Sequence, residues 1–564
     1  DRALPDTVLA MVETRLARLA VEARRVLRAA SVFGEVCWEG GVAVLLGGAM
    51  TAAAVSEWLS RLVKAELLAV RPHSRVPGER ELAFRHALLR EGAYTTLTDD
   101  DKRLGHRLAG DWLGGHGERD PMVLAGHFER GGDGARAAAY YLRASEQASL
   151  ISDLVAMVAR AGLGLACAPP VELRMALLGM RCEASSYDLQ LLATTMPDAE
   201  ELMRSAPRGS IPWAQAINAY LSGMMMAGRI PELLAGVALL RDVECAPEAA
   251  ERMALAFLSG CCLLDSLGRV REANALEGEF FTAVRPIGDR KPLARFWWNI
   301  AIGLRAAYAN DDPWRGLHHS LAIQAIHAEI GGDQIFLNME LFRGLNLWHL
   351  GSLADAEQTL KGIPAADEAL GVASSLRRQG LAWLLADRGA LDEAHALAAQ
   401  LAEHGERQHN PLDEGRGRWV LAEVLRRMGD LEGAEREVER ARAMAVPLEH
   451  AGVLGTLAMI RLAQGRTEDA VAAAEDAVAQ SAAMGGCGMF RGAFVRLARA
   501  EALHASGAHP AARQAIAEAR DRLLAIADKV ADPDHRQRLL HAVPENARTL
   551  ALAQAWLGDP SPER

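Results

Sequence analysis

A short pattern that recurs through the second half of the chain constrains its fold more than any other feature. In each copy an apolar helix end is followed by Gly, two or three polar residues, and an acidic residue beside Ala. The clearest copies are LGRVREA (267–273), LGSLADA (350–356), RGALDEA (388–394) and QGRTEDA (464–470). Gly allows the left-handed backbone that ends one helix, and the acidic residue suits the first turn of the next. Ala lets two antiparallel helices approach closely, so the pattern predicts helical hairpins.

The turns between these helices recur at a nearly regular spacing. We expect them about 32 residues apart near Gly132, Gly164, Met196 and Gly228, and then 36 to 42 apart near Gly268, Asn310, Gly351, Gly389, Gly429, Gly465 and Gly507. A period of this length, with two helices per unit, is typical of a helical-hairpin solenoid. The tetratricopeptide period is about 34 residues. The later units are therefore expected to have longer helices or looser turns.

The first part of the chain has a different pattern. Four short helical stretches, the first starting near Asp6, precede two extended runs at residues 67–70 and 81–84, separated by a loop with Pro and Gly at 72–78. Helices followed by a two-stranded wing predict a winged-helix domain. Such domains often read DNA, but the helix expected at 52–65 carries only Arg61 and Lys64 as cations. A DNA-reading helix needs several cations and amides aimed at phosphates and bases, so this role is the weaker interpretation.

Together these patterns predict a nearly all-α protein. We expect a winged-helix domain at 1–98, a helical connector with the first repeat at 99–148, and a tetratricopeptide-like superhelix at 149–545. Pro544 and the apolar helix after it predict a C-terminal cap with a frayed tail at 546–564.

Composition limits the compartment and the partners. The net charge of −11 over 564 residues gives no electrostatic reason to expect nucleic acid or an anionic membrane as a partner. Seven irregularly spaced Cys argue against a disulfide framework. The longest weakly polar run, residues 40–55, is shorter than the roughly 18 residues of a membrane span, and no signal segment opens the chain. We therefore expect a cytoplasmic protein. Because the chain starts at Asp1 inside a helical pattern, we also expect it to be part of something longer.

The sequence carries no recognisable catalytic motif. It has no G-x-x-x-x-G-K-[ST] phosphate loop, no G-x-S-x-G and no H-E-x-x-H. This region is therefore not expected to be an enzyme, to bind a metal, or to hold a cofactor of its own.

Several other groups of side chains could form a site, or could simply pack. His319 and His327 are two helical turns apart, about 12 Å along a helix, which is too far for one metal ion without other ligands. We therefore interpret them, with His318, as solvated or packing histidines. An aromatic group could line a pocket or belong to the core, and a run of three methionines is interpreted as adaptable packing. These residues are Phe296, Trp297, Trp298, Trp314, Met224, Met225 and Met226.

The strongest local candidates are Arg85 and His86 in the stretch ELAFRHALLREGAY (81–94). They lie where a strand is expected to lead directly into a helix, so free backbone N–H groups and the helix dipole favour an anion there. The planar, positively charged guanidinium of Arg can donate two hydrogen bonds to a phosphate, and His can donate one to a phosphate oxygen. The alternative is that His86 only caps the helix or packs.

Several segments resemble the C-terminal half of a class of large bacterial signalling proteins. They are FRHALLREGAY (84–94), LGHRLAGDWL (104–113), LAGHFERGG (124–132) and AAAYYLRASEQA (137–148). The class is the signal-transduction ATPases with numerous domains (STAND), which includes the MalT-like regulators. The opening LPDTVLAMVETRLARL and the closing VPENARTLALAQAWLG resemble the members fused to serine/threonine protein kinases. Similar halves also follow class III nucleotide cyclase domains.

The resemblance implies a role for the chain and for one residue. In that class a nucleotide-binding core precedes the winged helix, and the repeat array senses an inducer or a partner. A His at the strand-to-helix join contacts the nucleotide phosphate, and His86 matches that position, with Arg85 and Ala87 standing where the class usually has Met and Asp. ATP or ADP and Mg²⁺ would then be held by an upstream module.

The expected function is regulatory. The leading hypothesis is a sensory region of a multidomain signalling ATPase, with a protein partner or small inducer on the superhelix and oligomerisation possible on activation. One alternative is a free-standing tetratricopeptide scaffold that assembles other proteins. Another is a transcription regulator.

Overall fold

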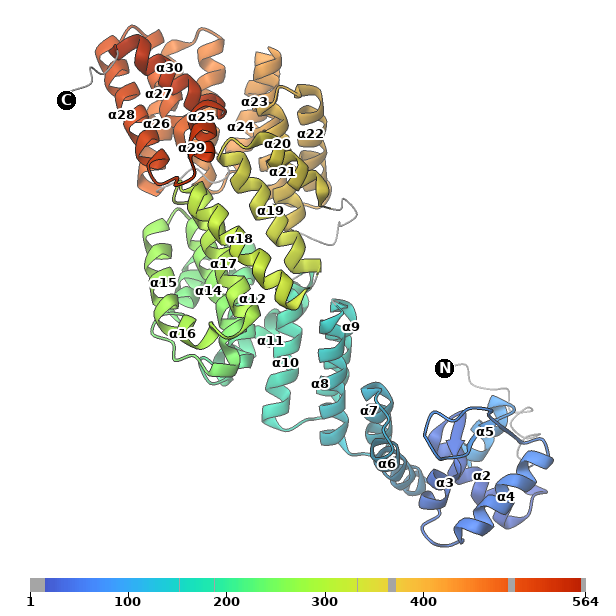
Figure 1. Cartoon of the computed structure of the whole chain (residues 1–564). Coiled ribbons are helices and arrows are strands. Elements are labelled where there is room, and N and C mark those ends of the chain that lie inside the picture. The colour runs from blue at the N-terminus through green and yellow to red at the C-terminus, as the bar shows by residue number, and fades with distance from the viewer. Residues whose placement is uncertain are drawn as a thin grey trace. The chain divides into compact units, whose positions relative to one another are not determined.

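The computed structural model describes residues 16–151, 153–186, 188–331, 333–363, 372–484 and 492–558. Within these ranges the protein is nearly all-α, with 29 α-helices and a small three-stranded antiparallel sheet (Figure 1). The chain forms two compact units, Asp1–Ala184 and Ser185–Arg564. None of the helices in the described ranges is both long enough and apolar enough to cross a membrane. The expected first helix start near Asp6 and the tail at 559–564 lie outside these ranges.

The first unit begins with a small sheet whose strand order is β1-β3-β2. The two predicted strands are confirmed as β2 (Leu68–Val70) and β3 (Glu81–Phe84). A third strand, β1 (Val36–Trp38), pairs with β3 on its other side. The predicted two-stranded wing is therefore part of a three-stranded sheet. The sequence analysis did not predict β1, because three residues are too few to show strand alternation and their pairing with β3 is not local.

The helices of the first unit follow the predicted order. They are α2 (Val21–Phe33), α3 (Glu39–Leu45), α4 (Ala52–Lys64), α5 (Ala87–Thr95), α6 (Asp99–Gly115), α7 (Pro121–Arg130), α8 (Gly134–Leu150), α9 (Leu154–Ala166) and α10 (Val171–Ser185). The apolar faces of α2 and α4 meet the sheet in one core, where Leu27, Leu59 and Leu82 are fully buried. From α6 onward the helices pair as antiparallel neighbours, as the repeat pattern predicts.

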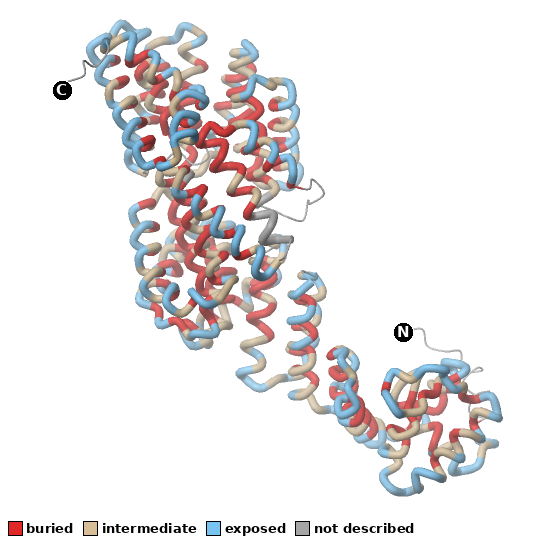
Figure 2. Tube along the Cα trace, viewed as in Figure 1, coloured by how far each residue is buried: buried red, intermediate tan, exposed pale blue. Residues whose placement is uncertain are grey.

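The second unit continues these hairpins. Its helices are α11 (Leu192–Ser205), α12 (Ile211–Met226), α13 (Ile230–Ala238), α14 (Ala250–Ser266), α15 (Val270–Ala283), α16 (Arg285–Gly288), α17 (Pro292–Tyr308), α18 (Pro313–Ile330), α19 (Asp333–His349), α20 (Leu353–Gly362), α21 (Val372–Asp387), α22 (Leu391–Arg407), α23 (Pro411–Met428), α24 (Leu431–Met444), α25 (Pro447–Ala463), α26 (Thr467–Met484), α27 (Gly492–Ala505), α28 (His509–Ala527), α29 (Pro533–His541) and α30 (Pro544–Leu557). Figure 2 shows buried residues along the helix sides that face each other and exposed residues on the outer sides. The fold is a tetratricopeptide-like array of helical hairpins.

Most of the predicted turns are confirmed. Positive φ angles, the left-handed conformation that the turn pattern requires, occur at Gly132, Gly228, Gly268, Gly351, Gly389, Gly429, Gly465 and Gly507. The Ala of each quoted motif is fully buried where two helices approach: Ala273, Ala356, Ala394 and Ala470. A turn also follows α17, where Asp311 has a φ of 55°.

Two predicted turns were wrong, because both residues lie inside helices. Gly164 lies in α9, and a Cβ built on it would come within 2.8 Å of Leu177 on α10. Its missing side chain lets two helices approach, which the sequence pattern could not distinguish from a turn. Met196 lies in α11, one residue before Pro197, which the helix accommodates in its first turns.

The C-terminal helices do more than end the stack. Pro544 starts α30 as predicted, but the segment before it also contacts hairpins nearly 200 residues earlier. Arg538 Nη1 donates to Ser352 Oγ at 3.2 Å, and a Cβ on Gly351 would lie 2.6 Å from the Arg538 carbonyl oxygen. Arg496 bonds to Asp311 at 3.2 Å, and the Trp314 ring of α18 lies 5.5 Å from the His535 ring of α29, which Figure 1 shows close to the start of α18. The array of the second unit therefore closes on itself.

Candidate functional site

Arg85 and His86 form the join between β3 and α5, as the sequence predicts. His86 is the N-cap residue of α5, with extended backbone (φ −137°, ψ 128°) and no side-chain cap hydrogen bond. The backbone around it is fixed, because Arg85 N donates to the Leu67 carbonyl at 3.2 Å and Leu89 N donates to the His86 carbonyl at 3.0 Å. The strand-to-helix geometry is therefore confirmed.

Both side chains of the join face solvent. Arg85 and His86 are exposed, and so are Ala87 and Leu88 in the first turn of α5. Among the described residues, none makes a hydrogen bond or ion pair with either basic side chain. The first N–H groups of a helix have no partner within it, so this end of α5 presents positive potential beside a guanidinium and an imidazole. The alternative in which His86 caps or packs does not match an exposed, non-capping ring. Contact with a nucleotide phosphate stays a prediction.

The join is held in place from its strand side by a buried carboxylate. Glu81 starts β3 with only 1% of its side chain exposed, and its Oε2 accepts from Trp38 Nε1 at 3.2 Å and from Arg75 N at 2.8 Å. The Arg71 and Arg75 guanidinium groups lie within 4 Å of the same carboxylate, at 3.9 and 3.7 Å. Glu81 thus ties β1 and the wing loop to the central strand that leads into the join.

The far end of α5 is held by a group of residues that the sequence analysis did not single out. Tyr94 Oη lies 2.7 Å from His106 Nε2 on α6, and His106 Nδ1 lies 3.0 Å from His127 Nδ1 on α7. The histidines are 1% and 5% exposed. Only their presence in the resembling segments 104–113 and 124–132 could have drawn attention to them. Residues 21 apart in sequence meet here because α6 and α7 form a hairpin.

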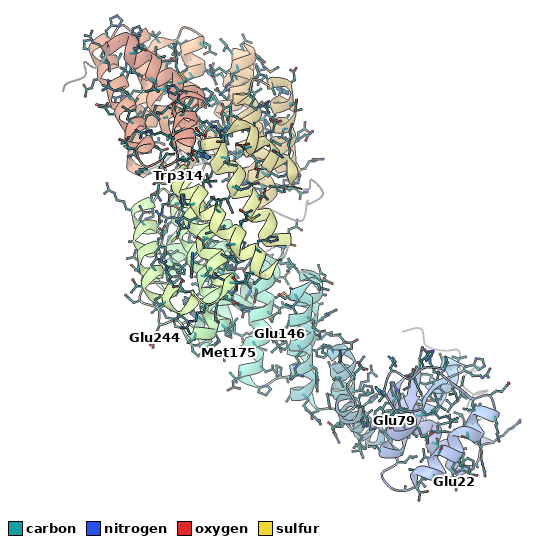
Figure 3. All side chains as sticks on the ribbon, viewed as in Figure 1. Glu22, Glu79, Glu146, Met175, Glu244 and Trp314 are labelled. Atoms are coloured by element: carbon teal, nitrogen blue, oxygen red, sulfur yellow. The ribbon has the colours of Figure 1, made fainter. Side chains whose placement is uncertain are left out.

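The other expected candidates pack against neighbouring residues or face solvent, and His318 is exposed. His319 Nδ1 is hydrogen-bonded to Asn299 Oδ1 at 2.8 Å, and burial lowers its pKa to about 4. The His318 ring lies against Trp314, which Figure 3 labels and which starts α18. In the part of the chain that the structure describes, no group of three potential ligands could hold a metal ion.

The aromatic residues belong to the core. Phe296 and Trp298 are 1% and 7% exposed and lie in two different core clusters, with Trp297 packed against both. A cavity beside Trp298 has a volume of about 10 Å³, room for one water at most. The core interpretation is confirmed for these three residues. In the methionine run, Met224 is buried and Met226 is 69% exposed at the end of α12.

Buried charged side chains join neighbouring hairpins of the second unit. The Arg305 guanidinium is 1% exposed and donates to Asp265 Oδ2 at 2.6 Å, to Asn274 Oδ1 at 2.7 Å and to Glu277. Burial raises the pKa of Asp265 to about 6, although Arg305 acts in the opposite direction. Asp265 and Arg305 come from α14 and α17, so this network fixes one hairpin against the next.

A second network also joins helices through buried polar side chains, here between residues about 40 positions apart. Asp387 accepts from Trp348 Nε1 at 2.9 Å and from Arg427 Nη2 at 3.1 Å, across separations of 39 and 40 residues. Glu423 is fully buried and accepts from Arg426 and Arg427. Burial opposes its ionisation, yet the two arginines hold the pKa of Glu423 below its usual range. These contacts tie α19, α21 and α23 to one another.

The would-be recognition helix of the winged-helix domain offers little free positive charge. Arg61 on α4 pairs with Glu57 at 2.6 Å, and its guanidinium lies 4.7 Å from the centre of the Trp58 ring. That leaves Lys64 as the only other cation of this helix.

The chain was compared with known proteins. No protein-family model matches it, and no curated protein matches it. Solved structures of helical-repeat proteins do. A Rap protein complexed with competence and sporulation factor is 12% identical with a TM-score of 0.41, covering 65% of this chain and 99% of that chain. A STAND protein with a tetratricopeptide repeat sensor from Pyrococcus horikoshii is 14% identical with a TM-score of 0.36, covering 86% of this chain and 66% of that one.

A third solved structure, the APC/C hetero-tetramer Cut9–Hcn1, is 12% identical with a TM-score of 0.41, covering 81% of this chain and 93% of that chain. At these identities the similarities concern the repeat fold alone.

Proposed function

We propose that this chain is the sensory and regulatory region of a multidomain signalling ATPase of the STAND class, most like those fused to a serine/threonine kinase. The array of the second unit binds a partner protein or a small inducer. The winged helix of the first unit relays that binding to a nucleotide-binding module elsewhere in the protein. The observation that carries the proposal is the exposed join, where Arg85 and His86 flank the uncapped start of α5.

The physical basis of the relay is an anion site at the join between β3 and α5. The nucleotide whose phosphate would occupy this site would be held by another domain. A phosphate oxygen at the join would meet free N–H groups, the helix dipole and two basic side chains. No phosphate loop is present in the sequence, so the nucleotide must be held by other residues. Loss of the His86 contact on partner binding would shift the balance between resting and active states.

The direct test replaces His86 in the longer protein that contains the nucleotide-binding module. We expect His86→Ala to weaken retention of bound nucleotide through gel filtration, or to raise basal activity. The matched control is His73→Ala, which removes another exposed histidine of the same unit from the wing loop. Retention and basal activity equal to those of the control would overturn the sensor role.

The isolated 564-residue chain provides the complementary test. It should neither bind nor hydrolyse ATP measurably, because it supplies only one side of the phosphate site. Binding of ATP by this chain alone, lost in His86→Ala, would mean that the site is complete here. A protein whose coding sequence holds no phosphate loop upstream would instead support the scaffold interpretation.

A further inference from the structure

The group formed by Tyr94, His106 and His127 has no role in the function proposed above. It lies inside the first unit, with one residue each from α5, α6 and α7. Both imidazoles are almost completely buried, and the three side chains are linked by contacts of 2.7 and 3.0 Å. A buried imidazole pair is costly unless its hydrogen bonds are made, so the geometry of this group matters.

The contact between the two imidazoles depends on their protonation. Two Nδ1 atoms 3.0 Å apart can share a hydrogen bond only if one carries a proton and the other offers a lone pair. In one arrangement His106 donates to His127, and Tyr94 donates to His106 Nε2. In the other, His127 donates to His106, whose Nε2–H then donates to Tyr94. When both rings are protonated, both Nδ1 atoms carry a proton, and neither can accept the hydrogen bond between them.

The surroundings favour the neutral rings. Burial, followed by the neighbouring His127, Arg130 and Arg90, lowers the pKa of His106 to about 3. Burial and Arg130 lower the pKa of His127 to about 4. The cations near the pair are Arg90 on α5, which is ion-paired with Glu91, and Arg130 on α7.

The remaining neighbours supply no carboxylate to the pair. Lys102 of α6 lies 5.5 Å from the centre of the Tyr94 ring. From α2 the contact is the apolar ring of Phe33, 6.4 Å from that of His127, while Arg28 of the same helix bonds to Thr96. Among the described residues, no carboxylate makes a hydrogen bond or ion pair with either imidazole, so a proton added there would have no direct counter-ion.

The helices around the group are packed too closely to move independently. A Cβ on Gly105 of α6 would lie 3.2 Å from Val32 of α2, and one on Gly110 would lie 2.9 Å from Phe128 of α7. The backbone of α6 is therefore held between its neighbours, and Tyr94 attaches the last turn of α5 to it. The first turn of the same helix is the exposed join at His86.

We propose that Tyr94, His106 and His127 are positioning residues that form a proton-dependent clamp, which holds α5 on the first repeat hairpin while both rings are neutral and releases it when both are protonated. The clamp concerns how α5 is held in this chain. It can be tested without the upstream module, so it stands or falls separately from the role of His86.

Hydrogen exchange of the 564-residue chain tests the clamp locally. In Tyr94→Phe the hydroxyl is lost and the buried His106 Nε2 loses its partner, which costs about 1–3 kcal/mol. We expect peptides covering α5 and α6 to lose roughly 5- to 150-fold of their protection at neutral pH, by conversion of that cost at 1.36 kcal/mol per factor of ten. Tyr140→Phe, on α8 of the same unit and stacked on Phe128, is the matched control and should leave their protection unchanged.

A second variant separates a proton-dependent clamp from plain packing. Asn places a polar atom near the position of Nδ1 but cannot titrate, so His127→Asn should keep most of the protection at neutral pH. It should also reduce the loss that the wild-type chain shows between pH 6.5 and 4, after correction for intrinsic exchange. Two results would overturn the proposal: wild-type protection in Tyr94→Phe, or an undiminished acid-induced loss in His127→Asn.

Nitrogen-15 NMR of labelled histidines gives a readout that does not depend on variants folding. At pH 6 the spectrum should contain two neutral imidazoles, one of them protonated on Nδ1. Two imidazolium signals assigned to His106 and His127 at that pH would overturn the proposal.

Discussion

Two buried polar junctions of this molecule join successive helices by opposite chemistry. In the first unit, α5, α6 and α7 meet through a tyrosine and two uncharged imidazoles. In the second unit, α14 and α17 meet through a fully buried guanidinium between two carboxylates. The first junction excludes charge and the second neutralises it. They should therefore respond differently to acid and to the loss of one partner.

The difference follows from what each helix contributes. Arg305 can reach Asp265 and Glu277 at once, so its charge is matched on both sides and the ion group is satisfied. The histidine pair is buried and has no carboxylate bonded to it among the described residues, so the neutral rings are favoured. The charged junction is therefore weakened when one charge is removed, and the neutral junction is weakened when charge is added.

The largest expected effect comes from breaking the charged junction. Arg305→Ala would leave Asp265 buried without its counter-ion, which costs about 3–5 kcal/mol for a buried pair. Urea unfolding of the second unit should show this as a lower midpoint. Arg271→Ala removes an exposed arginine of the neighbouring α15, and its change should stay within about 0.5 kcal/mol. Equal losses in the two variants would mean that the Arg305 network adds no more than a surface charge.

The second largest effect is expected from acid, which should lower the stability contributed by the neutral junction. The unfolded chain takes up protons on His106 and His127 near pH 6.5, while the folded chain does so only near pH 3 and 4. Stability from this pair is therefore complete above pH 6.5 and falls as the pH drops toward 4. Each histidine contributes about 1.4 kcal/mol per pH unit within that window. Hydrogen exchange across α5–α7 between pH 7 and 5 measures the slope, and His127→Asn should reduce it by about half.

The stability that Asp265 contributes to the charged junction should depend on pH in the opposite direction. Burial raises the pKa of Asp265 from 3.8 to about 6, so the folded chain binds that proton before the unfolded chain does. The contribution of Asp265 therefore increases as the pH falls from 6 to 4, by about 1.4 kcal/mol per pH unit. The measurement is the difference in unfolding free energy between wild type and Asp265→Asn. It should move in favour of the wild type on acidification; a difference independent of pH would contradict the assignment.

The smallest effect belongs to the ion pairs that close the array. Arg496 and Asp311 are about one-fifth exposed, at 22% and 19%, and lie 3.2 Å apart. Solvent screens such a pair, so a double-mutant cycle with Asp311→Asn and Arg496→Gln should give a coupling of about 0.5–1 kcal/mol. A coupling of several kcal/mol would contradict this expectation and would mean that the Arg496–Asp311 pair contributes as much as a buried ion pair.

Much of the fold was predictable because its signals are local. The Gly turns, the buried Ala of each motif and the strand-to-helix join at 81–94 all depend on residues adjacent in sequence. The third strand, β1, depends on pairing with residues more than 40 positions away, and three residues carry no period of their own. Gly164 shows the remaining limit, since the same residue type serves a turn and a close helix contact.

The candidate site was predictable only in part. Arg85 and His86 could be named because a short motif places them at a helix start. The Tyr94–His106–His127 group, the Arg305 network and the Asp387 network could not, because their members come from different helices. Each separate residue is unremarkable in sequence, and only packing shows that His106 faces His127.

The closure of the second unit has a consequence for how the protein is made. Repeat arrays ordinarily fold in the order of synthesis, since each hairpin needs only its neighbours. Here Ser352 bonds to Arg538, 186 residues later. At the roughly 5–20 residues per second of translation, α20 waits about 10–40 s for that partner. During this interval the surface that α29 will cover is open to chaperones and to other nascent chains. The yield of folded protein should therefore depend on translation speed more than the local contacts of its hairpins suggest.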